Sequence, residues 1–116
     1  MRNYKNIVAW KRADELTIEI YRITRNFPKE EIYGLTSQLR RAAISIAANI
    51  VEGFKKTGPA DKIRYLNISQ GSLEECRYYL ILSNDLNYGN TDVLAKQIDE
   101  VARLLAAYSN AVRKNN

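Results

Sequence analysis

Basic side chains are the residues of this sequence whose types and spacing suggest a chemistry, namely the binding of phosphate groups. Four of them fall within the first twelve positions with no acid among them, and others follow in close pairs further along the chain. Lys and Arg neutralise phosphates without reading a base sequence, so clustered positive charge is typical of nucleic-acid binding. The candidate contacts are Arg2, Lys5, Lys11, Arg12, Arg40, Lys55, Lys56, Lys62 and Arg64.

Aromatic residues lie close to these basic clusters in the sequence. They are Tyr4, Trp10, Phe54 and Tyr65, and such rings can stack on bases if they are exposed. A net charge of +5 over 116 residues is modest, so charge alone also fits a solvated basic face that only keeps the protein in solution.

A second group of polar residues follows a single stripe at helical spacing. It contains Gln38, Arg41, Ser45, Asn49 and Glu52, and the next segment carries Glu74 and Glu75. If the two segments form antiparallel helices, Arg41 comes level with these two glutamates, and we expect an ion pair with one of them that fixes the helix register. We therefore assign Gln38, Arg41, Asn49, Glu52, Glu74 and Glu75 to a structural polar network. A small acid/base site is the weaker interpretation.

The residues that are missing exclude most familiar catalytic sites. The sequence contains no histidine and a single cysteine, Cys76, so it has no Ser-His-Asp triad, no Cys-His pair and no Cys-based zinc site. It contains no Gly-Lys-Ser/Thr phosphate loop, and its paired carboxylates are too sparse for a convincing magnesium site. We expect no cofactor, no metal, no small-molecule substrate and no enzymatic activity.

The length and composition are typical of one ordinary globular domain covering residues 1–116. Apolar residues make up 46% and charged residues 27% of the chain. No apolar run approaches the length of a membrane span, and Asp14, Glu15 and Glu19 follow the basic N-terminus too soon for a signal peptide. These features predict a soluble cytoplasmic protein that does not bind a membrane.

Three breaks divide the chain into four segments with apolar residues at helical spacing. The breaks are Phe27–Gly34, Gly53–Pro59 and Asn87–Asn90, where Pro and Gly favour turns and helix ends. No segment alternates apolar and polar residues as a half-buried strand would. The pattern predicts an all-α fold, an antiparallel up-down-up-down four-helix bundle.

Gly71 falls inside the third predicted helix, where glycine costs about 1 kcal/mol relative to alanine. Such a glycine indicates that another backbone passes close by. We expect Ala43, Ala47 and Ala48 of the second helix to be its neighbours.

The second predicted helix is apolar or small on almost every side from Ala42 to Val51. A helix of this kind is buried on more than one face. Surplus apolar surface on a small domain suggests a subunit interface, although a central helix buried within its own bundle would show the same pattern.

Several runs resemble the four-helix bundle proteins first noted in bacterial 23S rRNA intervening sequences. The most specific is the run Tyr33–Gly53, and the likeness extends to Val8–Ala13, to Phe27–Glu31 and to Ile68–Glu75. Related proteins are the accessory variability determinants of diversity-generating retroelements. The resemblance implies ring-shaped homo-oligomers with a pentamer favoured, nucleic-acid binding beside a reverse transcriptase, and no enzymatic activity.

Taken together, these features predict a non-enzymatic oligomeric bundle that binds RNA or DNA through a basic surface. Its partners would be further copies of itself, a nucleic acid, and a reverse transcriptase or other protein. The alternative is an adaptor for protein–protein interaction that binds no nucleic acid.

Overall fold

The computed structural model describes residues 3–115, and four helices make up most of them. They are α1 (Val8–Thr24), α2 (Leu35–Lys55), α3 (Pro59–Asp85) and α4 (Asp92–Lys114), with short 3-10 turns η1 (Tyr4–Asn6) and η2 (Lys29–Glu31). Residues 3–115 contain no strand. The predicted all-α class with four helices is confirmed, and each predicted break coincides with a connection between helices.

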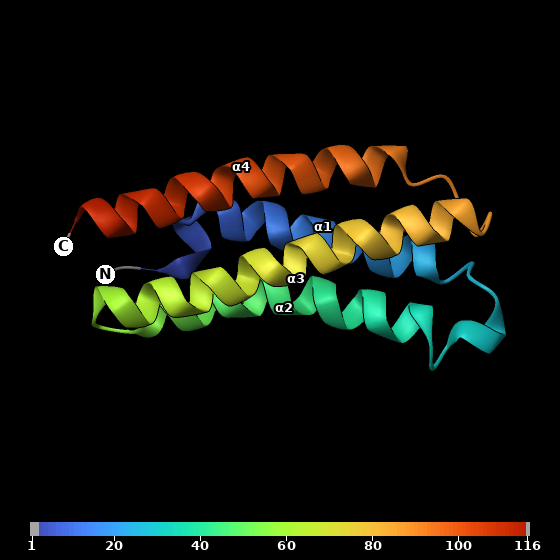
Figure 1. Ribbon diagram of the computed structural model, residues 1–116, viewed down its shortest axis with the longest axis horizontal. Coiled ribbons are helices and arrows are strands. Elements are labelled where there is room, and N and C mark those ends of the chain that lie inside the picture. The colour runs from blue at the N-terminus through green and yellow to red at the C-terminus, as the bar shows by residue number, and fades with distance from the viewer. Residues whose placement is uncertain (1–2, 116) are drawn as a thin grey trace.

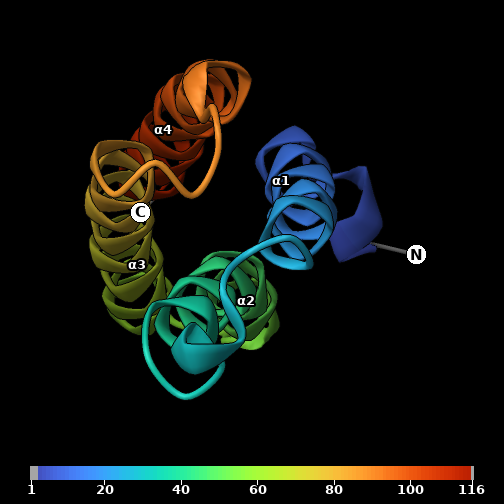
Figure 2. The ribbon, with the colours of Figure 1, turned by 90° about the vertical axis from the view of Figure 1, so that its right-hand side faces the viewer.

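The four helices lie side by side in a body that measures 46 × 24 × 22 Å. Figure 1 shows the α1–α2 and α3–α4 connections at one end, and the α2–α3 turn with both chain ends at the other. We call the second of these the turn end, formed by residues 3–12, 52–65 and 108–115, and the first the loop end. Figure 2 shows the helices at four corners, with α1 opposite α3 and α2 opposite α4.

Local signals explain where the helices begin and end. Pro59 opens α3 at a position whose N–H no helix would use. The Glu31 carboxylate accepts the backbone N–H of Leu35 at 3.1 Å and so caps the start of α2. In the α3–α4 connection, Asn87 adopts a left-handed φ of 63°, which asparagine tolerates better than most residues, and Asn90 accepts the N–H of Asp92 at 3.0 Å.

The core is built from the apolar stripes of all four helices. Leu16, Ile20, Ile46, Ile98 and Leu105 are fully buried, in agreement with the helical spacing of these residues in the sequence. None of the helices within residues 3–115 combines the length and the apolar character that a membrane crossing requires.

Two polar contacts, one buried and one partly buried, connect α2 to its neighbours. The Ser69 hydroxyl of α3 donates to the backbone carbonyl of Ile46 at 2.7 Å, and the Thr17 hydroxyl of α1 contacts the carbonyl of Ala43 at 3.2 Å. Each contact joins one residue of α2 to one residue of a neighbouring helix. Together the two contacts therefore fix the axial alignment of α1 and α3 relative to α2.

The expectation for Gly71 is wrong. Gly71 is exposed, and within residues 3–115 no atom beyond its own helix backbone lies within 4 Å of the place where a Cβ would stand. The close approach occurs at Gly53 instead, where a Cβ would stand 3.1 Å from the carbonyl oxygen of Lys62 and 3.4 Å from the Cβ of Tyr65. A glycine is needed there because the end of α2 and the start of α3 touch after a tight turn.

The apolar circumference of α2 is only partly covered by the other helices. Ala42, Ala43 and Ile46 are buried, whereas Ile44 keeps 46% of its surface exposed and Ala48 is also exposed. The outer side of α2 therefore presents apolar surface that the described chain leaves open to solvent.

Candidate nucleic-acid interface

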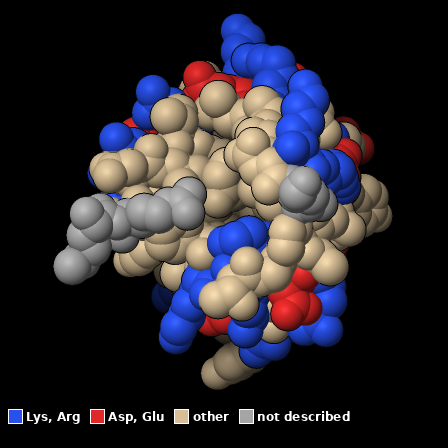
Figure 3. Space-filling view, turned by 90° about the vertical axis from the view of Figure 1, so that its left-hand side faces the viewer, with Lys and Arg blue, Asp and Glu red and all other residues tan. Residues whose placement is uncertain are grey.

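The fold concentrates positive charge at the turn end. Residues 3–12, 52–65 and 108–115 carry nine Lys and Arg residues but only two acids, Glu52 and Asp61. The rest of the described chain, residues 13–51 and 66–107, carries eight Lys and Arg residues against eleven Asp and Glu residues. Figure 3 shows the turn end, with Lys and Arg side chains around a tan centre and fewer Asp and Glu side chains. A chain with modest net charge thus has one strongly basic end.

The exposed members of this cluster come from four elements. Lys5 belongs to η1, Lys11 to the first turn of α1, Lys55 to the end of α2 and Arg64 to the start of α3, and all four are exposed. They come together because these elements all reach the same end of the bundle (Figure 1).

Lys56 and Arg64, two cations of the turn end, both lie against the ring of Tyr65. The Lys56 ammonium lies 5.2 Å from the centre of the Tyr65 ring, and the Arg64 guanidinium lies 5.0 Å from it. Arg64 also donates to the Tyr65 hydroxyl at 3.1 Å. The ring therefore holds two positive charges side by side on the surface of α3.

Two further candidates have structural contacts of their own. The Lys62 ammonium donates to the carbonyls of Phe54 at 2.9 Å and Gly53 at 3.3 Å, which satisfies the C-terminal end of α2. Arg12 forms ion pairs with Glu15 at 3.0 Å and Glu100 at 3.2 Å. Their charges add to the field of the turn end, but their side chains already have these partners.

Arg40 lies away from the other candidates, at the loop end. Its Nε donates to the Thr24 hydroxyl at 2.9 Å, and its guanidinium lies 4.7 Å from the centre of the Tyr21 ring. These contacts join the start of α2 to the end of α1. Arg2, the remaining candidate, falls outside the described residues.

The aromatic residues named from the sequence pack mainly on one another. Tyr4 meets Trp10 edge to face at 5.1 Å between ring centres, and it meets Phe54 at 6.5 Å. All three rings are half-buried. This cluster fastens η1 to α1 and α2, and so it holds Lys5 at the turn end.

Sequence reasoning missed Arg113 and Lys114, which form the last turn of α4 at the turn end. Both are exposed, and basic residues there complement the negative end of the helix dipole. The available signal was the expected antiparallel order of four helices, which brings the end of the fourth helix level with the turn between the second and the third.

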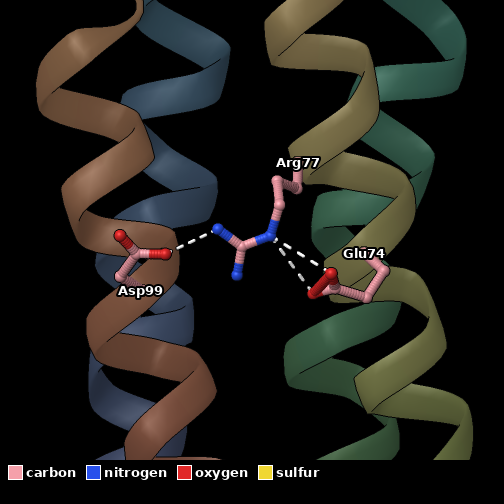
Figure 4. Close-up of polar contacts among 3 residues, drawn as sticks. All are labelled: Glu74, Arg77 and Asp99. Atoms are coloured by element: carbon pink, nitrogen blue, oxygen red, sulfur yellow. Dashed lines mark hydrogen bonds and ion pairs between the residues drawn. The ribbon is translucent and has the colours of Figure 1, made fainter.

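The predicted ion pair from Arg41 to Glu74 or Glu75 is wrong. Within residues 3–115 the salt-bridge partner of Glu74 is Arg77, at 3.2 Å, and Arg77 also reaches Asp99 of α4 at 2.5 Å (Figure 4). The hydrogen bond to Asp99, more than those to Glu74, raises the pKa of Arg77 above its ordinary value. The Glu74 carboxylate thus pairs with an arginine one turn away on its own helix. The same arginine connects α3 to α4.

Smaller polar contacts occur near the other residues of the predicted network. Arg41 and Glu75 line the same cavity of about 210 Å³, which agrees with the predicted axial alignment of α2 and α3. Across it, Ser72 of α3 donates to Ser45 of α2 at 2.7 Å, and within α2 the Asn49 amide donates to the Ser45 carbonyl at 2.8 Å. The remaining members, Gln38 and Glu52, are exposed.

Groups suited to covalent or metal chemistry are few in the described part of the chain. Cys76 is buried, and the loss of solvation raises the pKa of its thiol to about 12, so it stays protonated. No group of three or more Cys, Asp or Glu side chains within residues 3–115 is arranged to hold a metal ion.

Comparison with known proteins places the chain in a family. No curated protein matches it. Among solved structures it is similar to a protein of unknown function from the S23 ribosomal protein family of Bacteroides thetaiotaomicron, with a TM-score of 0.81 at 23% sequence identity over 89% of this chain and 96% of that chain. At this identity the likeness shows a shared fold.

The 23S rRNA-intervening sequence protein family matches residues 5–107, which include all of α1, α2 and α3 and most of α4. The resemblance inferred from the sequence is confirmed by this match. The chain therefore belongs to the 23S rRNA-intervening sequence protein family.

Proposed function

We propose that this protein is a non-enzymatic, oligomeric nucleic-acid-binding protein whose turn end contacts the phosphates of RNA or DNA. The observation that carries the proposal is the division of charge along the bundle, with nine basic residues against two acids at the turn end. Such a surface attracts a polyanion through the release of condensed counterions, whatever the base sequence.

The bundle in this proposal is an antiparallel up-down-up-down unit of a ring-shaped homo-oligomer, with a pentamer favoured. Support comes from exposed apolar residues on the outer side of α1 and α2. Thr17 contacts Ala43, and the residues that follow them, Ile18 and Ile44, leave 45% and 46% of their surfaces exposed. A ring joins two different faces of neighbouring subunits, so each copy can cover this surface of the next.

Assembly would also strengthen the binding of nucleic acid. Five copies of a chain with net charge +5 carry a formal charge of +25 on one particle. Because the excess of basic over acidic residues in each copy lies at the turn end, a ring of parallel bundles gathers this charge on one rim. A polyanion that spans several subunits then gains from each of them.

The test is a binding titration of labelled single-stranded RNA and DNA across a salt series. We expect binding at low ionic strength, with the logarithm of the association constant falling linearly with the logarithm of salt concentration. The absence of binding to either nucleic acid at low ionic strength would contradict the proposal and would favour the protein–protein adaptor.

Oligomerisation is tested separately by light scattering on the parent chain and on the variant Ile44→Glu. We expect a multimer for the parent and smaller particles for the variant, because a charge at an apolar interface is costly to bury. The matched control is Ile81→Glu, which changes an apolar residue of similar exposure on α3. A parent chain that stays monomeric at all concentrations would overturn the ring.

A further inference from the structure

A cavity of about 280 Å³ opens at the turn end, between the α2–α3 turn and the last two turns of α4. Its apolar walls are Phe54 and Pro59 on one side and Tyr108 and Val112 on the other. This volume is slightly below the roughly 300–1,000 Å³ of sites for drug-sized ligands, so it suits one planar ring system and not an extended molecule.

The lining combines aromatic and aliphatic side chains with a few polar groups. Thr57 and Asn115 add a hydroxyl and an amide, both able to donate and accept hydrogen bonds. The Lys62 ammonium lies 5.8 Å from the centre of the Phe54 ring and belongs to the same wall. Faces for stacking together with edge-directed polar groups are the features that proteins use to hold an unstacked base.

Cations lie directly beside the cavity along the chain. Lys55 and Lys56 occupy the positions between the lining residues Phe54 and Thr57, and Arg113 and Lys114 those between Val112 and Asn115. Cationic residues therefore neighbour the lining residues of both walls along the chain, and the Lys56 ammonium also contacts the Tyr65 ring. Phosphates on either side of a bound base would meet these two pairs.

We propose that this cavity takes a single unstacked base of a nucleic-acid strand, while Lys55–Lys56 and Arg113–Lys114 hold the phosphates that flank it. The inference rests on the proposed function and adds a class of ligand, namely single-stranded segments. A base inside a duplex is paired and stacked on both faces, so it can enter the cavity only after it leaves the helix, which costs free energy. The turn end thus distinguishes single strands from duplexes without reading sequence.

The test uses the intact protein and two labelled probes of equal length and charge. One is a single-stranded DNA of mixed sequence, and the other is the same sugar-phosphate chain with abasic sites throughout. We expect the strand with bases to bind at least about fivefold more tightly, as stacking of one base on an aromatic wall provides. Both probes should show the same salt slope, because their phosphates are the same.

Variants that fill the cavity separate the base from the phosphates. Ala111 lines the cavity and is exposed, so Ala111→Leu should remove the preference for the strand with bases and leave binding of the abasic strand unchanged, because leucine adds volume without a ring on which a base could stack. Thr57→Leu fills the cavity from the opposite wall and serves as the second variant. The matched control is Ala106→Leu, at an exposed position of α4 outside the cavity, which should keep the preference. Circular dichroism checks that each variant is folded.

The two proposals fail in different ways. Equal affinity of the parent chain for both probes would overturn the base cavity and leave electrostatic binding standing. A preference that survives in both filled variants would also overturn it. If neither probe binds at low ionic strength, the proposed function fails and the cavity proposal falls with it.

Discussion

Ser69 of α3 donates its hydroxyl hydrogen to the backbone carbonyl of Ile46 of α2 at 2.7 Å, and neither residue is accessible to solvent. The carbonyl lies in the middle of α2, so this contact fixes the axial alignment of α3 relative to α2 at that point. A buried hydroxyl that has a partner contributes to stability, whereas one without a partner costs its lost hydration. The protein contains both cases, because Ser109 Oγ of α4 is buried and has no hydrogen-bond partner within residues 3–115.

The pair gives a matched prediction for stability. Ser69→Ala and Ser109→Ala each place alanine in a buried helix position, so the gain in helix propensity is the same for both. Only Ser69→Ala removes a hydrogen bond, and we expect it to lower the free energy of unfolding by about 1 kcal/mol relative to Ser109→Ala. Denaturant unfolding at one protein concentration measures the difference. Equal free energies for the two variants would show that the Ser69 hydrogen bond adds nothing.

The two glycines of α2 and α3 provide a second prediction. Gly71→Ala should raise the free energy of unfolding by up to about 1 kcal/mol, because the position is helical and open. Gly53→Ala should lower it by about 1–3 kcal/mol, since the added Cβ would press on the carbonyl of Lys62, which α3 holds in place. Thermal unfolding ranks the two variants against the parent. A Gly53→Ala variant as stable as Gly71→Ala would show that the end of α2 can move away.

A third prediction concerns pH and the hydrogen bond between Tyr88 and Glu31 at the loop end. The Tyr88 hydroxyl donates to Glu31 at 2.8 Å. This bond raises the pKa of Tyr88 above 10.0, whereas the backbone N–H of Leu35, and after it the Tyr88 hydroxyl, lowers the pKa of Glu31 below 4.5. The bond therefore stabilises the fold between these two values. Its contribution disappears as the pH rises through the raised pKa of Tyr88 or falls through the lowered pKa of Glu31.

Replacing Tyr88 with phenylalanine should therefore lower the melting temperature between pH 4.5 and 10.0, and the gap to the parent should shrink beyond each limit. Melting followed by circular dichroism over a pH series measures the gap. Tyr33→Phe is the control, because Tyr33 is 93% exposed, and it should leave the melting temperature unchanged at every pH. A gap for Tyr88→Phe that widens in alkali would contradict the assignment.

The helical elements and their order of connection could be predicted because local chemistry determines them. Pro28, Gly53 and Pro59 interrupt the helical pattern, and the apolar stripes between the breaks became the core. The axial alignment of α2 and α3 could also be predicted, because a short turn between antiparallel helices allows little shift of one helix along the other. These features depend on residues close together in the sequence or on repeating patterns.

Side-chain partners could not be predicted in the same way. The sequence suggested Arg41 as the partner of Glu74 or Glu75 because antiparallel helices bring these residues level, whereas Arg77 pairs with Glu74 on the same helix and reaches Asp99 of α4. Likewise Gly71 looked like a point of close approach, although its helix turns that position outward to solvent. Arg40 was a candidate because of its charge, and only the fold shows that it lies at the loop end.

The most direct test of the basic end compares two double variants that change the net charge by the same amount. Lys55→Glu with Lys56→Glu reverses charge at the turn end, and Arg25→Glu with Lys29→Glu reverses it at the exposed loop end. Lys62 is left intact because it satisfies the carbonyls at the end of α2. The measurement is the affinity for a single-stranded probe across a salt series.

If the turn end binds the phosphates, the first variant binds at least about tenfold more weakly at low salt, and its salt slope falls by about one for each phosphate that is no longer neutralised. The second variant should keep the slope of the parent. An equal decrease in affinity in the two variants, or no decrease in either, would contradict a nucleic-acid interface at the turn end.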